Sequence, residues 1–194
     1  CEKPLVIKYD HLEMLEKLEK KYNKKIYTIL QLRLHPTIKK LKKEIEKSDK
    51  FYKVKLDYIT PRGRWYDFSW KGNFDKSGGV LFNIGVHFFD MLIWIFGDPV
   101  NFEINKSSNS AKGKLILKNA EIDFFLSVNN EDLPHKEWKP HRLITVDGKE
   151  LEFSEGFTEL HNKSYINIID GNGFGINDIK KTIDIIEKMN NDER

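Results

Sequence analysis

The segment from residue 78 to residue 96 constrains the fold more than any other part of the chain, because its apolar residues run nearly all round a helix. A helix without a polar face has to be buried inside a domain. The run is short for a membrane span, and Asn83, His87 and Asp90 interrupt it with polar side chains. The sequence therefore predicts a buried core helix, which ends at the glycine in position 97.

The hydrophobic pattern on either side of this helix predicts a sheet covered by helices. Asp147-Gly148 is typical of a hairpin turn, and residues 60–76 are expected to form a long aromatic and basic loop that binds a ligand. These features predict an α+β domain with an open, mainly antiparallel sheet and helices packed on one face. Further helices are expected over 10–22, 36–48, 158–170 and 176–189, and strands over 26–35, 51–58, 100–106, 113–118, 121–129, 141–147 and 150–154.

Composition and charge exclude several classes of function. The 194 residues include 33 Lys and Arg against 30 Asp and Glu, and the charges are interspersed. We therefore expect neither a nucleic acid nor an anionic membrane as a partner. One cysteine, Cys1, excludes an internal disulfide framework and any zinc or iron–sulfur site built from cysteines. The expectation is a cytoplasmic protein without a metal.

Three polar residues share one stripe of the buried helix. On a straight α-helix His87 lies about 40° from Asn83, and Asp90 lies about 20° to the other side. Burying such groups without partners would cost about 1–3 kcal/mol each. Either Asp90 holds His87 in a satisfied core network, or the stripe is a catalytic site. We favour the catalytic site, because a histidine oriented by a carboxylate is a ready general base.

A second group of polar residues is predicted along the strands 26–35 and 51–58. Alternation places Gln31, Arg33 and His35 on one strand face. Arginine forks suit phosphates and carboxylates, although a solvated edge with charge pairs explains each residue equally well. The neighbours expected at the end of the second strand are Tyr58, Thr60, Arg62 and Arg64.

Two shorter motifs contain proline or glycine. Lys3 precedes Pro4, so its backbone is expected to be extended, and the bond between the two residues can be cis. The glycine-rich segment 171–175 lies between two predicted helices rather than after a strand, and no Walker lysine follows it. We interpret it as a connector, and the chain shows no dinucleotide-binding fingerprint.

Several of these residues resemble the motifs of one known family. Glu2-Lys3-Pro4 resembles the E-K-P motif of the Gfo/Idh/MocA-type sugar oxidoreductases. Residues 78–90 resemble that family's G-G-x-x-x-D-x-G-x-H-x-x-D helix, with Asn83 in place of the first Asp. A narrower group, the WlbA/WbpB-like dehydrogenases, oxidises the 3-hydroxyl of UDP-N-acetylglucosaminuronate in surface-polysaccharide (lipopolysaccharide) biosynthesis. The segments similar to that group are 31–36, 58–72 and 173–178.

The resemblance implies one half of a two-domain enzyme that uses NAD, with NADP not excluded. Residues 1–9 would end a strand of the cofactor domain, and residues 10–194 would form the substrate and oligomerisation domain. The chain opens just ahead of E-K-P, so we expect a Rossmann domain that binds most of the NAD to precede it in the full protein. The fragment alone is then expected to be inactive, and to associate through its sheet face as a homo-dimer or homo-tetramer.

The resemblance also implies the roles of individual residues. Lys3 and His87 match the family's catalytic lysine and histidine. His87 would be the base, oriented by Asp90, and Lys3 would stabilise the alkoxide and, with Pro4, align the nicotinamide; the roles of Lys3 and His87 could be reversed. Asn83 cannot take a proton, but it can orient the substrate hydroxyl. The candidates for binding the nucleotide sugar are Gln31, Arg33, Tyr58, Thr60, Arg62 and Arg64.

Two alternatives stay open. A dehydrogenase of the same family that acts on a simple polyol or another sugar would need no diphosphate contacts in the loop 60–76. A homologue that has lost catalysis would serve as a regulator or assembly partner, although the intact Lys3 and His87 argue against that interpretation.

Overall fold

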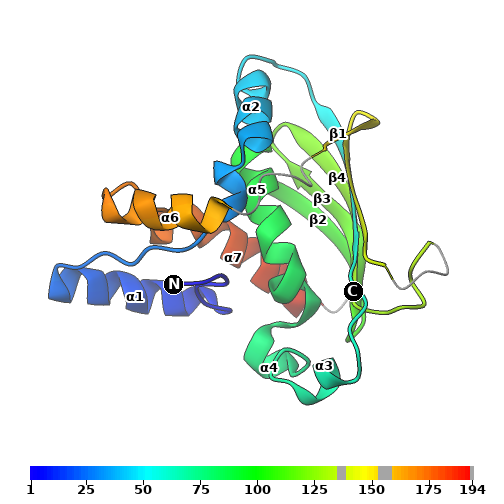
Figure 1. Cartoon of the computed structure of the whole chain (residues 1–194), viewed down its shortest axis with the longest axis horizontal. Coiled ribbons are helices and arrows are strands. Elements are labelled where there is room, and N and C mark those ends of the chain that lie inside the picture. The colour runs from blue at the N-terminus through cyan, green and yellow to red at the C-terminus, as the bar shows by residue number, and fades with distance from the viewer. Residues whose placement is uncertain (135–138, 153–158, 193–194) are drawn as a thin grey trace.

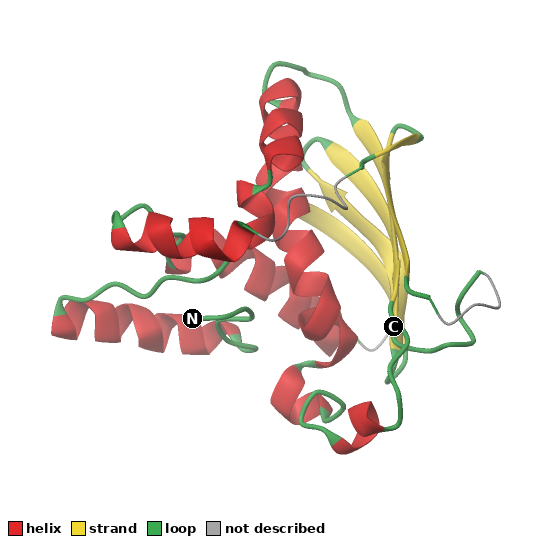
Figure 2. Cartoon of the chain, in the orientation of Figure 1, coloured by secondary structure: helices red, strands yellow, loops and turns green. Residues whose placement is uncertain are grey.

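The computed structural model describes residues 1–134, 139–152 and 159–192. The strands form one layer, and the helices gather on one face of it (Figure 1 and Figure 2). The predicted α+β architecture is confirmed. The helical segments are α1 (Tyr9–Tyr22), η1 (Gln31–Leu34), α2 (Pro36–Ile45), α3 (Trp65–Phe68), α4 (Phe74–Ser77), η2 (Leu81–Gly85), α5 (Val86–Phe96), α6 (Leu160–Ile169) and α7 (Ile176–Asn191). The strands are β1 (Tyr52–Ile59), β2 (Pro99–Lys106), β3 (Ser110–Leu117), β4 (Ala120–Ser127), β5 (His141–Val146) and β6 (Lys149–Glu150).

These strands form one open sheet in the order β2-β3-β4-β1-β5-β6. β1 and β4 run parallel, and the other neighbouring pairs are antiparallel. In β1 the side chains of Val54 and Leu56 are buried in the core, whereas Lys53 and Lys55 on the opposite face are exposed. The prediction of a mainly antiparallel sheet with helices on one face is therefore confirmed.

The apolar segment predicted as a core helix packs against this sheet. Phe89 and Phe96 are fully buried. Gly85 permits the close approach, because a Cβ there would lie 2.9 Å from the Phe89 ring and 3.1 Å from Leu126 of β4. By length and composition Phe74–Phe96 could cross a membrane, but 78% of its most apolar window is buried inside the domain. The segment is thus a core helix, as its sequence predicts.

This helix is not α-helical throughout. Leu81–Gly85 form the π-helical turn η2, and Val86–Phe96 form the α-helix α5. Asn83 lies inside the π turn, whereas His87 lies in the first turn of the α-helix. The angles expected for a straight α-helix therefore do not relate these two side chains. Such π turns occur frequently at functional sites.

The prediction of a strand over residues 26–35 is wrong. Thr28 forms an isolated bridge with Phe174, and Gln31–Leu34 form the 3₁₀-helix η1. Arg33 accounts for the difference, because its side chain is only 5% exposed and turns into the core between two buried leucines. Three successive buried residues do not fit the alternation of a strand, so tertiary burial overrides the local pattern.

Arg33 forms a buried ion pair with Asp90 of α5. Its Nη2 lies 2.6 Å from Oδ1 of Asp90, and its Nε lies 2.9 Å from Oδ2. The Nη2 group also donates to the backbone oxygen of Asp178, near the start of α7, at 2.7 Å. The hydroxyl of Thr182 donates to Asp90 at 3.4 Å. One side chain therefore joins η1, α5 and α7 through charge-assisted hydrogen bonds.

The C-terminal part agrees with the sequence analysis at the hairpin turn and at α6, but not over the last predicted strand. Asp147 and Gly148 have φ values of 50° and 76°, as the predicted hairpin turn requires. The strand predicted over 150–154 is wrong, because β6 covers only Lys149–Glu150 and residues 151 and 152 lie in no strand; residues 153 and 154 lie outside the described part of the chain. The predicted helix 158–170 is α6, and residue 158 likewise lies outside that part.

We predict that Arg33→Met lowers the free energy of unfolding by about 3–5 kcal/mol, because it leaves the Asp90 carboxylate buried without its counter-charge. The matched control is Lys188→Met, which breaks the Lys188–Asp184 pair, whose side chains are 60% and 39% exposed. It should cost less than about 0.5 kcal/mol. Equilibrium urea unfolding at pH 7 measures both changes, and equal losses would contradict the assigned role of the buried pair.

Candidate active site

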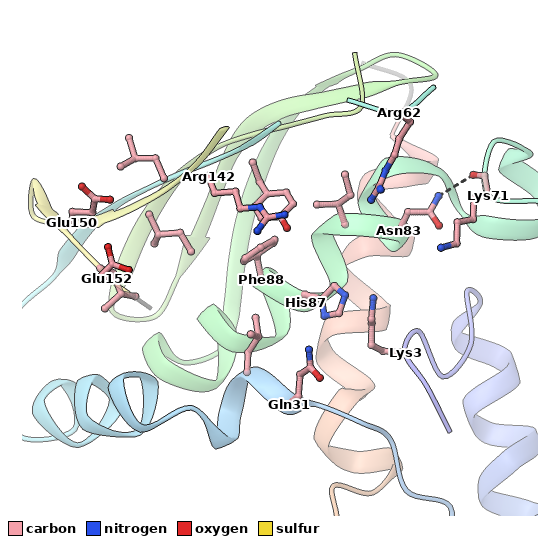
Figure 3. Close-up of a pocket in the computed structure, with 16 residues that line it drawn as sticks. Lys3, Gln31, Arg62, Lys71, Asn83, His87, Phe88, Arg142, Glu150 and Glu152 are labelled. Atoms are coloured by element: carbon pink, nitrogen blue, oxygen red, sulfur yellow. Dashed lines mark hydrogen bonds between the residues drawn. The ribbon is translucent and has the colours of Figure 1, made fainter. Parts of the chain in front are cut away.

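A cavity of about 490 Å³ opens between the core helix, η1 and the strands β1 and β5 (Figure 3). The residues that line it come from the N-terminal segment, the helices, and the strands, so the fold brings together parts of the chain that are distant in sequence. Six of the predicted site residues lie in its wall: Lys3, Gln31, Tyr58, Arg62, Asn83 and His87. The remaining lining residues are Leu32, Lys71, Ile84, Phe88, Arg142, Leu143, Ile144, Glu150, Leu151 and Glu152.

The N-terminal segment places Lys3 at this cavity. The amino group of Cys1 donates to the backbone oxygen of Tyr27 at 2.7 Å, and the Cys1 oxygen accepts from the N–H of Ile29 at 2.9 Å. These bonds hold the first residues beside the segment that leads into η1. The peptide bond between Lys3 and Pro4 is cis.

Lys3 and His87 project into the same end of the cavity (Figure 3). Burial, opposed by the charge of Glu2, lowers the pKa of Lys3 from 10.5 to about 8. Burial also lowers the pKa of His87 from 6.5 to about 3, and the positive charge of Lys3 adds to that effect. At neutral pH the imidazole is therefore uncharged, while the amine of Lys3 is protonated in most molecules and neutral in some. Such a pair can accept and release a proton.

Asn83 lies beside this pair and is held by the segment between β1 and η2. Its Nδ2 group is 2.9 Å from the backbone oxygen of Lys71, 3.0 Å from the hydroxyl of Tyr66 and 3.3 Å from that of Ser77. Among the described residues, no hydrogen bond engages Oδ1. Since Asn83 lines the cavity, this oxygen can accept a hydrogen bond from a ligand.

The rest of the wall divides into a cationic part and an acidic part. Arg62, Lys71 and Arg142 line it together with Lys3, and the guanidinium of Arg142 lies 5.3 Å from the centre of the Tyr58 ring. Two acidic side chains, Glu150 and Glu152, lie at the other end (Figure 3). The cavity can therefore orient a ligand that carries negative charge toward the end with Asn83 and Arg62.

Several predicted roles do not agree with these positions. Asp90 does not orient His87, because its carboxylate pairs with Arg33 and Thr182 in the core. Arg33 is for the same reason not at the cavity wall. His35 is buried, and its Nδ1 accepts from the N–H of Thr37 at the start of α2. Arg33, His35 and Asp90 stabilise the fold around the site, and none of them lines the cavity.

Two residues of the predicted ligand loop also lie off the wall. Thr60 is buried, and Arg64 is an exposed residue just before α3. Thr60 directly follows β1, and Arg64 directly precedes α3, whereas Tyr58 and Arg62 of the same predicted group do line the cavity. Pro4 is half-buried and does not line the cavity.

Sequence reasoning missed four polar residues of the wall. Lys71 lies in the loop that was predicted to bind a ligand, so its position gave a signal. Arg142 gave none, because it reaches the cavity through the antiparallel pairing of β5 with β1, which sets Arg142 opposite Tyr58. Glu150 and Glu152 follow the hairpin turn after β5, and the pairing of β6 with β5 brings this part of the chain to the cavity.

Known proteins match this chain closely. The family described as oxidoreductase family, C-terminal alpha/beta domain, matches residues 42–123. The WlbA (WbpB) dehydrogenase from Thermus thermophilus, solved with NAD and alpha-ketoglutarate, superimposes with a TM-score of 0.92 at 38% identity, over 98% of this chain and 63% of that one. The same enzyme with NAD and UDP-GlcNAcA gives 0.90 and 38%, over 97% of this chain and 62% of that one.

A more distant protein shares the fold. The WlbA dehydrogenase from Bordetella pertussis, solved with NADH and UDP-GlcNAcA, gives a TM-score of 0.80 at 18% identity, over 100% of this chain and 69% of that one. This chain thus spans a little under two thirds of the length of the Thermus enzyme. The family resemblance predicted from the sequence is confirmed: the chain belongs to the Gfo/Idh/MocA oxidoreductase family and has the fold of its C-terminal α/β domain.

Proposed function

We propose that this chain is the catalytic and substrate-binding half of an NAD-dependent dehydrogenase that oxidises the 3-hydroxyl of UDP-N-acetylglucosaminuronate for surface-polysaccharide biosynthesis. The observation that carries the proposal is the pairing of Lys3 with His87, both with lowered pKa values, at the cationic end of one cavity. The Thermus enzyme, at 38% identity, was solved with NAD and UDP-GlcNAcA, which supports the choice of cofactor and substrate.

The described residues fit the reactive end of NAD. Gln31 lines the cavity, and its side-chain amide can bond a carboxamide or hydroxyl of a bound ligand, since its Oε1 has no hydrogen-bond partner among the described residues. The glycine-rich loop 171–175 is a poor cradle for the phosphates, because the N–H of Gly175 already donates to Asp178 at 2.8 Å. We therefore assign the phosphates to a Rossmann domain in the full protein. When bound, the nicotinamide supplies the hydride acceptor.

Lys3 and His87 divide the handling of the proton between them. His87 is uncharged at neutral pH, so it can accept a hydrogen bond from the substrate hydroxyl and hold it in place. Its lowered pKa makes the imidazole too weak a base to keep the proton. Lys3, with a pKa of about 8, retains it when its amine starts in the neutral form, a fraction that grows as the pH rises toward 8. This reverses the order favoured by the sequence, in which His87 was the first choice as base.

The cationic wall suits the charged groups of the substrate. Arg62, Lys71 and Arg142 can bind the uronate carboxylate or the diphosphate. The backbone N–H of Arg62 donates to the oxygen of Val128 at 3.0 Å, which fixes the point where this residue leaves the sheet. Asn83 presents Oδ1 to the sugar. A simple polyol would leave the cationic groups of the wall without partners, which favours a nucleotide sugar.

We predict that the full-length protein reduces NAD with UDP-N-acetylglucosaminuronate and not with inositol or free sugars, because only the nucleotide sugar satisfies the cationic wall. Lys3→Met should lower kcat by at least about 100-fold, the usual contribution of an acid–base group. His87→Ala should also lower kcat, because the substrate hydroxyl loses the acceptor that holds it. Absorbance at the nicotinamide band measures all of these rates. Turnover of inositol with none of the uronate would favour the polyol alternative, and no turnover of any substrate would favour the non-catalytic one.

We further propose that the chain associates as a homo-dimer or homo-tetramer through the outer face of its sheet, which no described helix covers (Figure 2). That face mixes both signs of charge, as in the contact of Lys114 with Glu121 at 3.1 Å, and it includes the ring of Phe125. A face with charges of both signs and an apolar ring can pair with the same face of a second copy by two-fold symmetry.

Light scattering of the full-length protein tests this association. We expect a multiple of the monomer mass for the wild type, and a shift toward monomer for Phe125→Glu, which replaces an apolar ring of that face with a charge. Phe68→Glu is the matched control, because Phe68 is 89% exposed on α3, away from the sheet. A monomeric wild type, or an unchanged mass for Phe125→Glu, would contradict the assignment of this surface.

A further inference from the structure

Residues 60–77, here called the ligand segment, connect β1 to the core helix and expose many aromatic side chains. Trp65, Phe68, Trp70 and Phe74 are all more than half exposed. Only one aromatic residue of the segment, Tyr66, is buried in the described structure, at 4% exposure. Because this segment buries few apolar side chains, specific hydrogen bonds are needed to hold its backbone in one position.

Asn83 of η2 supplies such an anchor. Its Nδ2 donates to the backbone oxygen of Lys71 at 2.9 Å and to the hydroxyl of Tyr66 at 3.0 Å, two points five residues apart in the ligand segment. The Lys71 partner is a carbonyl oxygen, which can only accept, so the atom of Asn83 that faces it has to be the nitrogen.

The same carbonyl receives a second donor. The hydroxyl of Ser77 donates to the Lys71 oxygen at 2.8 Å, and Nδ2 of Asn83 also lies 3.3 Å from that hydroxyl. The backbone at Lys71 is therefore fixed from the core helix and from the end of α4 together. Lys71 and Arg62 of this segment are the residues that add positive charge to the cavity wall near Asn83 (Figure 3).

We propose that Asn83 is a positioning residue for nucleotide binding: its amide nitrogen holds the ligand segment so that Lys71 and Arg62 face the cavity, while its amide oxygen faces the sugar. One side chain then couples the wall that binds the anionic part of the substrate to the pair that takes the proton. This inference rests on the proposed function for the identity of the ligand, and on the hydrogen bonds of Asn83 for the anchor.

An amide serves at this position where a carboxylate would not. An aspartate in place of Asn83 would set a negative oxygen against the carbonyl of Lys71, and the hydroxyl of Ser77 would be the side-chain donor left to that carbonyl among the described residues. The substitution Asn83→Asp keeps the size of the side chain and an acceptor toward the cavity. It therefore removes the anchor while it leaves the contact with the sugar hydroxyl, which separates the two roles of the residue.

The test measures UDP binding, because UDP lacks the sugar that Asn83 would touch. In the full-length protein, calorimetric titration should give a Kd for UDP about tenfold higher in Asn83→Asp than in the wild type, the size of one lost buried hydrogen bond. The Kd for NAD should stay the same. Tyr66→Phe, which removes one acceptor of the anchor and lies outside the cavity wall, should weaken UDP binding in the same direction by a smaller factor.

Hydrogen exchange of the ligand-free protein provides the second arm. Backbone amides of residues 66–72 should exchange faster in Asn83→Asp, whereas the matched surface variant Asn101→Asp should change neither exchange there nor UDP binding. An Asn83→Asp protein with wild-type Kd for UDP and wild-type exchange would overturn the proposal. A wild-type protein that does not bind UDP would instead contradict the proposed function, while the exchange arm would still decide whether Asn83 anchors the segment.

Discussion

The buried ion pair between Arg33 and Asp90 determines how the rest of the site is arranged. It fastens η1 and α7 to the core helix, one turn beyond His87. Its two charges are almost completely removed from water, so each depends on the other to remain in the interior. Because η1 also carries Gln31, this pair sets the distance between one wall of the cavity and the helix that carries the histidine.

Burial of Lys3 and His87 then lowers the proton affinity of both side chains. Loss of hydration is the largest influence on both Lys3 and His87, so both pKa values fall. Two cationic forms side by side would also repel each other, and the pair therefore holds at most one proton near neutral pH. In the proposed mechanism, the acid–base centre would depend on desolvation rather than on a carboxylate that orients a histidine.

The sequence was sufficient for the core helix, for the strands β1 to β5, and for placing Lys3, Asn83 and His87 near one another, because apolar periodicity and family motifs report directly on those features. It failed where long-range contacts decide. Local alternation predicts Arg33 as a strand residue, and only its contact with Asp90 explains why it is buried in the core. Arg142 reaches the cavity only because β5 pairs with β1, which no local pattern around Arg142 indicates. The sequence suggested that Asp90 contacts His87, because the two residues are close in the chain. The carboxylate of Asp90 instead pairs with Arg33, which lies 57 positions away.

The most direct test of this account is a titration of Lys3 and His87 in the ligand-free, full-length protein. Nuclear magnetic resonance of lysine labelled at Cε and histidine labelled at Cε1, with assignments from Lys3→Arg and His87→Gln, reports each pKa separately. Lys3 should titrate near pH 8, and the ring of His87 should show no titration between about pH 5 and 9 because its pKa is about 3. A lysine that titrates near its ordinary pKa of 10.5 and a histidine that titrates near 6.5 would contradict the claim that burial forms the proton-accepting pair.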